Sequence, residues 1–258
     1  MLRVLSENIK KVGVFGEVMN KIFEKKYDLR ASDFDRFDRI MPSSVLELFQ
    51  DVACWHADEI GTGYDAMIAR SYVWVLVKIR FRILKNPEKY QSVVVRTWPL
   101  EPNKFIYRRE YIIENESGEK LICGSSEWVV MHSEKRRLVL APDLYSIKDG
   151  FCKEMNFEQK LDKVEDFEES GTPYSIMPGF SQLDGNSHVN NTKYTNFVLD
   201  AVNPQEASDI DEFQIDYRKE VLQGVKLDIY HTKKDNIVIA KGLNEDRDTM
   251  FACKIVYK

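Results

Sequence analysis

An acid, an amide and an imidazole occupy alternate positions in one short stretch of this chain, at Asp184, Asn186 and His188. Asn186 and the glycine before it tolerate the backbone angles of tight turns. An apolar pattern with helical spacing begins at Tyr194, and a helix start offers unpaired N–H donors and a partial positive charge. We therefore predict a helix over 189–202, preceded by a turn that can polarise a carbonyl oxygen. Any one of these residues alone could be a purely structural helix cap. Only the combination of the three groups favours a reactive site.

Composition and charge are those of a soluble globular protein. The chain has 258 residues, 43% of them hydrophobic, and a formal net charge of −5; a nucleic-acid surface is usually basic, so we expect no nucleic-acid partner. The four cysteines form no CxxC pair, no His, Asp and Glu spacing matches a metal site, and no glycine-rich phosphate loop occurs. We therefore expect neither a metal nor a cofactor.

The targeting signals that a sequence can carry are not visible here. No apolar run is long enough to span a bilayer, there is no secretory signal, and residues 1–26 lack the composition of an organelle transit peptide. We expect a cytoplasmic protein with reduced thiols. A homodimer is compatible with the sequence.

The elements that must position the turn begin with a helix. Residues 42–47 are typical of a helix start, with Ser44 as the cap and Glu47 completing a capping box. Apolar residues follow at helical spacing, and Gly61 with a second glycine two residues later is expected to end this helix. A long strand is predicted over 73–83, because its odd positions are all apolar. We expect those odd positions to share one dry face.

The order of elements then repeats along the chain. Further strands are expected over 92–98, 105–115, 121–131, 174–181, 211–221, 225–231, 236–241 and 249–257. Helix, four strands, linker, helix and four strands is most simply two copies of one unit. We place an N-terminal repeat over 20–143, a linker, helical in part, over 144–170 and a C-terminal repeat over 171–258. The predicted fold is α+β, a tandem hot dog in which each repeat wraps a curved antiparallel sheet around one long helix. A strand–helix order alone also fits other α+β folds.

A family resemblance follows from several segments. The segment LDGNSHVNNTKY at 183–194 resembles the signature of the acyl-ACP thioesterases of plants and bacteria, enzymes that act on acyl carrier protein (ACP). Further segments are similar to the same family: LFQDVACWHA at 48–57, WVL at 74–76, SEWVVM at 126–131, RRL at 136–138 and YRKE at 217–220. The resemblance covers roughly residues 20–258.

The resemblance implies a double hot-dog enzyme that hydrolyses the thioester of a fatty acyl chain on ACP, in fatty acid biosynthesis. Matching positions imply that Asp184, Asn186, His188 and Glu220 are catalytic. Plant members often carry a cysteine directly after that glutamate, whereas this chain has Val221. A Cys-His-Asn acyl-enzyme route is therefore disfavoured, and we expect attack by water.

Roles for these residues follow as a hypothesis. Glu220 or Asp184 acts as the general base, while His188 and Asn186 orient the water or the carboxylates. Backbone N–H groups at the predicted helix start at Val189 polarise the thioester carbonyl. Because a thiolate leaves readily, no strong acid is needed.

The acyl chain needs an apolar tunnel, and the acidic carrier needs a basic surface. Tunnel walls are expected in the N-terminal repeat, although for each single residue plain core is the better interpretation. Candidate walls are Val52, Trp55, His56, Met67, Trp74 and Leu76. A solvated face is an equally good interpretation of the basic residues. Candidate ACP contacts, by charge alone, are Arg108, Arg109, Lys135, Arg136 and Arg137.

Other functions stay open at this point. An acyl-CoA thioesterase differs only in the carrier. A hot-dog module that binds acyl ligands without catalysis is a second alternative, which the set of four polar residues disfavours. A dehydratase is a third, because hot-dog folds also carry that chemistry; the resemblance disfavours it.

Overall fold

The computed structural model describes residues 21–141, 144, 147, 150–158 and 160–258, so most of the 1–26 segment lies outside it. The first half of the described chain contains β1 (Phe23–Asp28), the 3-10 helix η1 (Ala31–Asp33), α1 (Pro42–Glu59), α2 (Tyr64–Ile68), β2 (Tyr72–Ile83), β3 (Ser92–Pro99), β4 (Tyr107–Asn115) and β5 (Lys120–His132). The second half contains β6 (Tyr174–Ile176), the 3-10 helix η2 (Phe180–Gln182), α3 (Lys193–Val202), β7 (Ile210–Tyr217), β8 (Leu227–Lys234), β9 (Ile237–Leu243) and β10 (Thr249–Tyr257).

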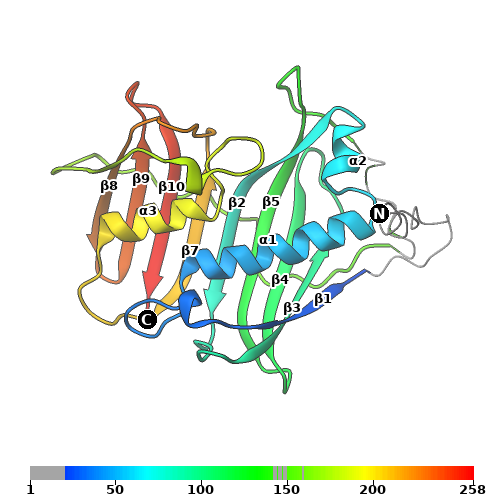
Figure 1. The fold of residues 1–258 in the computed structure, drawn as a ribbon, viewed down its shortest axis with the longest axis horizontal. Coiled ribbons are helices and arrows are strands. Elements are labelled where there is room, and N and C mark those ends of the chain that lie inside the picture. The colour runs from blue at the N-terminus through cyan, green and yellow to red at the C-terminus, as the bar shows by residue number, and fades with distance from the viewer. Residues whose placement is uncertain (1–20, 142–143, 145–146, 148–149, 159) are drawn as a thin grey trace, which may run out of the picture.

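One ten-stranded sheet joins the two halves, in the order β1-β3-β4-β5-β2-β7-β10-β9-β8-β6. The paired strands are antiparallel throughout the described part of the chain. The helices α1 and α3 lie end to end across one face of this sheet (Figure 1). Strands β2 and β7 pair at the centre, where the rings of Phe81 and Phe213 stack with centroids 5.5 Å apart. The architecture is the predicted double hot dog.

The first long helix forms as predicted but starts earlier. Pro42 stands in its first turn, where a missing N–H leaves no hydrogen bond unmade, and Met41 is the N-cap residue without a capping side chain. Ser44 is therefore inside the helix and buried, so the predicted capping box is wrong. Beyond the C-terminal end of the helix, Gly61 has a φ of +68°, a conformation that glycine adopts without strain.

The long strand β2 changes its buried face part of the way along. A register shift against β5 lies between Leu76 and Lys78, so Val77 is an extra residue of the kind that forms a β-bulge. Leu76 is buried before the bulge, whereas Ile79 and Phe81 are buried after it. The prediction of one dry face made of odd positions holds only beyond the bulge.

The second long helix starts later than predicted. Helix α3 begins at Lys193, because Val189 is held in β-type pairing and cannot adopt helical angles. It forms a bridge with Leu183, and its N–H donates to the carbonyl of Val221 at 2.8 Å. The predicted helix over 189–202 is therefore wrong at its N-terminal end, and the Val189 N–H is already used.

The linker crosses the sheet face opposite the helices. Residues 150–158 and 160–170 contain neither helix nor strand, so the helical part that the sequence allowed is absent from them. Leu161 and Val164 are buried. The Lys78 ammonium donates to the Leu161 carbonyl at 2.7 Å, and the Val164 N–H donates to the Asp216 carboxylate at 2.8 Å. These contacts cover polar side chains that alternate with the core residues of β2 and β7.

Candidate active site

The predicted polar turn is closed by hydrogen bonds that involve the backbone and the carboxylate of Asp184. The Asp184 N–H donates to the His188 carbonyl at 2.7 Å. The Asp184 carboxylate accepts hydrogen bonds from the N–H groups of Asn186 at 2.8 Å and His188 at 3.1 Å. Ser187 has a φ of +64°, which lets the chain reverse. The carboxylate of Asp184 therefore holds the backbone in the shape that presents Asn186 and His188.

A second chain segment brings Glu220 to this turn. Glu220 follows the end of β7, and a bridge between His188 and Leu222 holds its segment against the turn. The Nε2 atom of His188 lies 3.6 Å from a carboxylate oxygen of Glu220. Asp184, Asn186, His188 and Glu220 all line one cleft of about 530 Å³. The structure thus brings together the four residues for which the sequence predicted catalytic roles.

A fifth polar residue enters the same cleft. Arg136 stands on the turn after β5, lines the cleft, and forms an ion pair with the Glu220 carboxylate. The bonded oxygen is the one that faces His188. Sequence reasoning placed Arg136 only among the carrier contacts, because nothing in the residue order indicates that the β5 turn meets the loop after β7.

An apolar pocket continues from the cleft into the N-terminal repeat. It has a volume of about 250 Å³, and Val73, Trp74 and Asn186 line both the pocket and the cleft. Met67, buried on α2, forms part of its wall, as does Trp128. Asn186 therefore lies at the junction between the polar cleft and the apolar pocket.

The predicted tunnel walls are only partly at this pocket. Met67 and Trp74 line it, and Leu76 lines the cleft. Val52 and His56 are buried in the core and are not among the lining residues. Trp55 is 51% exposed, and the Lys25 ammonium lies over its ring. The prediction for Trp55 is corrected, because its position on α1 faces solvent beside β1.

The predicted basic surface is smaller than expected. Arg109 is buried, with its guanidinium 3.0 Å from His56 Nδ1. Arg108 donates to Glu110 at 2.7 Å beneath the linker. Neither Arg108 nor Arg109 can meet a protein partner, because successive residues of β4 point into the helix-covered and linker-covered faces of the sheet. The predicted carrier residues that are exposed are Lys135, Arg136 and Arg137.

The titratable groups around the cleft leave few candidates for proton transfer. Burial raises the pKa of the Tyr194 hydroxyl, which keeps this cleft residue protonated at neutral pH. Burial also raises the pKa of the Cys54 thiol in the apolar pocket, and a protonated thiol is a poor nucleophile. The other cysteines do not line the cleft or the pocket. Within the described residues no group of three or more His, Cys, Asp or Glu is placed to hold a metal ion.

The N-terminal repeat contains a second turn with the same hydrogen bonds. The Asp35 carboxylate accepts from the N–H groups of Phe37 at 2.8 Å and Arg39 at 3.0 Å. The Asp35 N–H donates to the Arg39 carbonyl at 2.8 Å, and Asp38 has a φ of +62°. Asp35, Phe37 and Arg39 thus correspond to Asp184, Asn186 and His188. The predicted repeat of pattern is therefore present at the level of individual hydrogen bonds.

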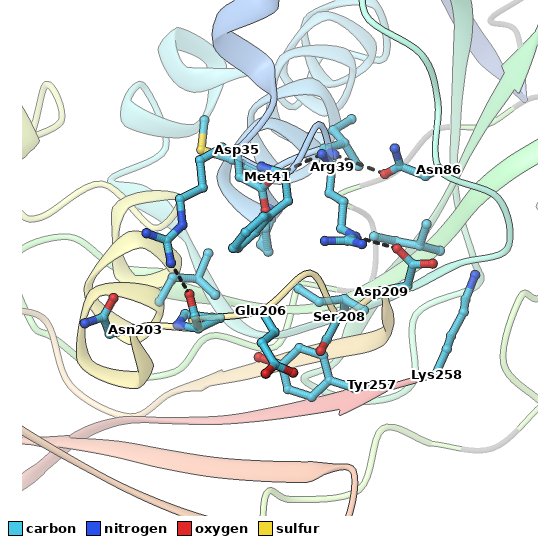
Figure 2. Close-up of a pocket in the computed structure, with 18 of the residues that line it drawn as sticks. Asp35, Arg39, Met41, Asn86, Asn203, Glu206, Ser208, Asp209, Tyr257 and Lys258 are labelled. Carbon is cyan, nitrogen blue, oxygen red and sulfur yellow. Dashed lines mark hydrogen bonds and ion pairs between the residues drawn. The ribbon is translucent and has the colours of Figure 1, made fainter.

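The cleft at this second turn has different side chains at three of the four corresponding positions. It has a volume of about 540 Å³ and is lined by residues of both repeats (Figure 2). Asn86 corresponds in position to Glu220. In both cases the N–H groups of the two preceding residues donate to a single carbonyl of the neighbouring strand. Arg39 is bonded to Asp209 at 2.5 Å. A phenyl ring, a paired guanidinium and an amide therefore replace the amide, imidazole and carboxylate of the first cleft.

Comparison with known families agrees with the fold. The model of the acyl-ACP thioesterase N-terminal domain matches residues 20–147, and that of the acyl-ACP thioesterase C-terminal domain matches residues 165–254. Together they cover most of the sequence, so the chain belongs to the acyl-ACP thioesterase family.

Curated relatives are similar at a lower level. The oleoyl-acyl carrier protein thioesterase 2, chloroplastic, of Arabidopsis thaliana is 28% identical over 256 residues, which is 88% of this chain and 68% of the relative. A chloroplastic acyl-[acyl-carrier-protein] hydrolase of Cuphea viscosissima is 26% identical over 214 residues, 77% of this chain and 52% of the relative. The chain thus spans between about half and two thirds of the length of these relatives.

Solved structures share the fold. An acyl-ACP thioesterase from Bacteroides thetaiotaomicron superposes with a TM-score of 0.85 at 20% identity, covering 94% of this chain and 100% of that one. The 12:0-ACP thioesterase from Umbellularia californica gives a TM-score of 0.82 at 20% identity, with 94% and 99% covered. At this identity the likeness establishes the fold alone. No helix in the described part of the chain is long and apolar enough to cross a membrane.

Proposed function

We propose that this protein hydrolyses the thioester of a fatty acyl chain on acyl carrier protein, releasing a free fatty acid and the carrier thiol in fatty acid biosynthesis. The observation that carries the proposal is the shared wall of the two cavities. Asn186 lines both the polar cleft and the apolar pocket. A thioester joins an apolar acyl chain to a polar carrier arm, so its carbonyl belongs at such a junction.

The geometry of the cleft supports a division of roles. Glu220 takes a proton from water as general base, with His188, 3.6 Å away, orienting the water and the carboxylate. The Asn186 amide donates to the thioester carbonyl as charge develops on its oxygen. The Asp184 carboxylate holds the turn through two backbone N–H groups. Because the Val189 N–H is used within the fold, the carbonyl depends on this side-chain donor.

The carrier arm enters from the side of the cleft that carries positive charge. Lys135 and Arg137 are exposed on the turn beside Arg136, and basic residues at a rim steer an acidic partner and speed its association. The relatives named above act, by their names, on acyl carrier protein thioesters. We infer the same carrier here. The cytoplasmic location and a homodimer stay predictions.

The test compares two carriers that hold one acyl chain. Purified protein is given matched acyl-ACP and acyl-CoA, and release of the thiol is followed. We expect faster turnover of acyl-ACP and a loss on the order of 10³-fold in kcat for Glu220→Gln. Preference for acyl-CoA would replace the carrier assignment. Binding of either thioester without hydrolysis would instead support the non-catalytic acyl-binding alternative.

A further inference from the structure

Arg136 occupies an unusual place in the cleft. Its N–H donates to the His132 carbonyl at 3.0 Å within the turn after β5, and its φ is +48°. Residues other than glycine seldom adopt this conformation, which recurs at functional sites. The guanidinium reaches the Glu220 oxygen that faces His188. A strained turn thus places a permanent cation beside the proposed general base.

The backbone N–H groups of the polar turn can contribute little to the stabilisation of a negative charge. The N–H groups of Asp184, Asn186, Ser187, His188 and Val189 all donate to acceptors in the turn or in the loop after β7. They cannot stabilise a new negative charge without breaking the loop that forms the site. An anion formed on the cleft side of the thioester therefore gains nothing from these five N–H groups, whereas charged side chains of the cleft can stabilise it.

The proposed function places the sulfur of the substrate on that side. With the acyl chain in the apolar pocket and the carbonyl at Asn186, the sulfur and the carrier arm would extend into the cleft. Arg136 lines the cleft and is not among the residues that line the apolar pocket. The cations that line the cleft are Arg136, Arg218 and Lys219. Lys219 is paired with Asp248 at 2.7 Å and the Nε atom of Arg218 is buried, whereas Arg136 forms an ion pair with the proposed base.

We propose that Arg136 is a further catalytic residue, which holds Glu220 before the reaction and stabilises the departing thiolate during it. The inference rests on the proposed function. Water loses a proton to Glu220 and its oxygen bonds to the acyl carbon. The carbon–sulfur bond then breaks, and sulfur leaves with the electron pair. Once protonated, Glu220 no longer neutralises the guanidinium, so the positive charge becomes available to sulfur. The thiolate finally takes the proton from Glu220, which restores the ion pair.

The experiment varies the leaving thiol while the acyl chain is kept constant. The alkyl thioester of N-acetylcysteamine and the aryl thioester of thiophenol differ in how much stabilisation the departing sulfur needs. The variant Arg136→Gly removes the charge, and its backbone suits the φ of +48°. We expect kcat to fall roughly 10²-fold on the alkyl thioester, as for loss of one stabilising donor, and much less on the aryl thioester. Guanidinium ion added to this variant should restore hydrolysis of the alkyl thioester, and Arg136→Lys should retain part of it.

A cation outside the site supplies the matched control. Lys104 is exposed, has a φ of +55° and lines neither the cleft nor the apolar pocket, so Lys104→Gly removes a charge at the same backbone conformation and should leave the kcat for both small thioesters unchanged. Equal losses on the alkyl and aryl thioesters in Arg136→Gly, without rescue by guanidinium, would overturn the thiolate role. A rise in KM for acyl-ACP alone would also overturn it and return Arg136 to carrier docking. If the wild-type protein cleaves neither small thioester nor acyl-ACP, the proposed function fails with it.

Discussion

The two equivalent turns allow the catalytic and structural contributions of one acid to be separated. Asp184 and Asp35 are both partly buried, and each accepts two backbone hydrogen bonds of 2.8–3.1 Å within its own turn. Replacing either by alanine removes the same set of contacts. We predict that Asp184→Ala and Asp35→Ala lose similar stability but that only Asp184→Ala loses activity.

The size of both effects follows from the hydrogen bonds. Hydrogen bonds to a charged acceptor contribute about 1.5–3 kcal/mol each when buried, and capping by an acid about 1 kcal/mol. For these partly exposed turns we expect about 1–2 kcal/mol per substitution, and a fall in melting temperature of about 2–8 °C for a chain of this size. Loosening the turn displaces Asn186 and His188, and a misplacement of this kind costs roughly 10²-fold in rate. Asp35→Ala should retain activity within about twofold, because its turn contributes no reacting group.

The assay combines thermal unfolding with steady-state hydrolysis of acyl-ACP. Asp184→Asn is a useful third variant, because asparagine keeps an acceptor oxygen for the two N–H groups but cannot take a proton from water. Substantial activity in Asp184→Asn would support Glu220 as the base. Equal loss of activity in Asp35→Ala and Asp184→Ala would mean that the loss reflects folding alone, and full activity in Asp184→Ala would refute the assignment of this turn to the site.

Three further changes test the pocket, the linker and the core. Ala57→Phe should fill the apolar pocket that this residue lines and shift the fatty acids released in a bacterial host toward shorter chains, as measured by product profiling. The hydrogen bond from Lys241 lowers the pKa of Asp166. The contribution of this ion pair to the free energy of unfolding is therefore present at neutral pH and is lost as the pH falls below about 4. The melting temperatures of Lys241→Met and the wild type should converge at such low pH. Gly124→Ala would place a Cβ 2.3 Å from the buried ring of Phe49 and should lower the free energy of unfolding by at least about 2 kcal/mol in a denaturant titration.

Local signals in the sequence located most of the strands, although a strand–helix order alone also fits other α+β folds. Strand β10 has the predicted limits and most other predicted strands differ at their ends, because alternation of apolar and polar residues reports burial directly; the predicted strand over 174–181 is limited to Tyr174–Ile176. The order of elements repeats, so the tandem arrangement could be inferred. The turn at Asp184 could be predicted because glycine and asparagine tolerate the backbone angles of turns and an aspartate side chain accepts hydrogen bonds from the N–H groups that follow it.

The errors arise where distant segments decide the outcome. Val189 has a helical neighbour pattern, yet pairing with Val221 keeps it extended. Charge alone could not distinguish Arg109, buried against His56, from exposed Arg137. The ion pair of Arg136 joins positions 84 residues apart in sequence. Such contacts depend on how distant segments pair in the fold, which local residue patterns do not report.

The repeated fold also places the two turns in different surroundings. The Asp184 turn of the C-terminal repeat adjoins an apolar pocket of the N-terminal repeat. Helix α1 has 18 residues and is followed by α2, and together they leave the pocket beside Trp74. Helix α3 has only 10 residues, and the chain after it, from Asn203 to Asp209, forms part of the second cleft. The two turns therefore meet different surroundings: the proposed hydrolysis is assigned to the Asp184 turn, whereas Arg39 of the Asp35 turn forms an ion pair with Asp209.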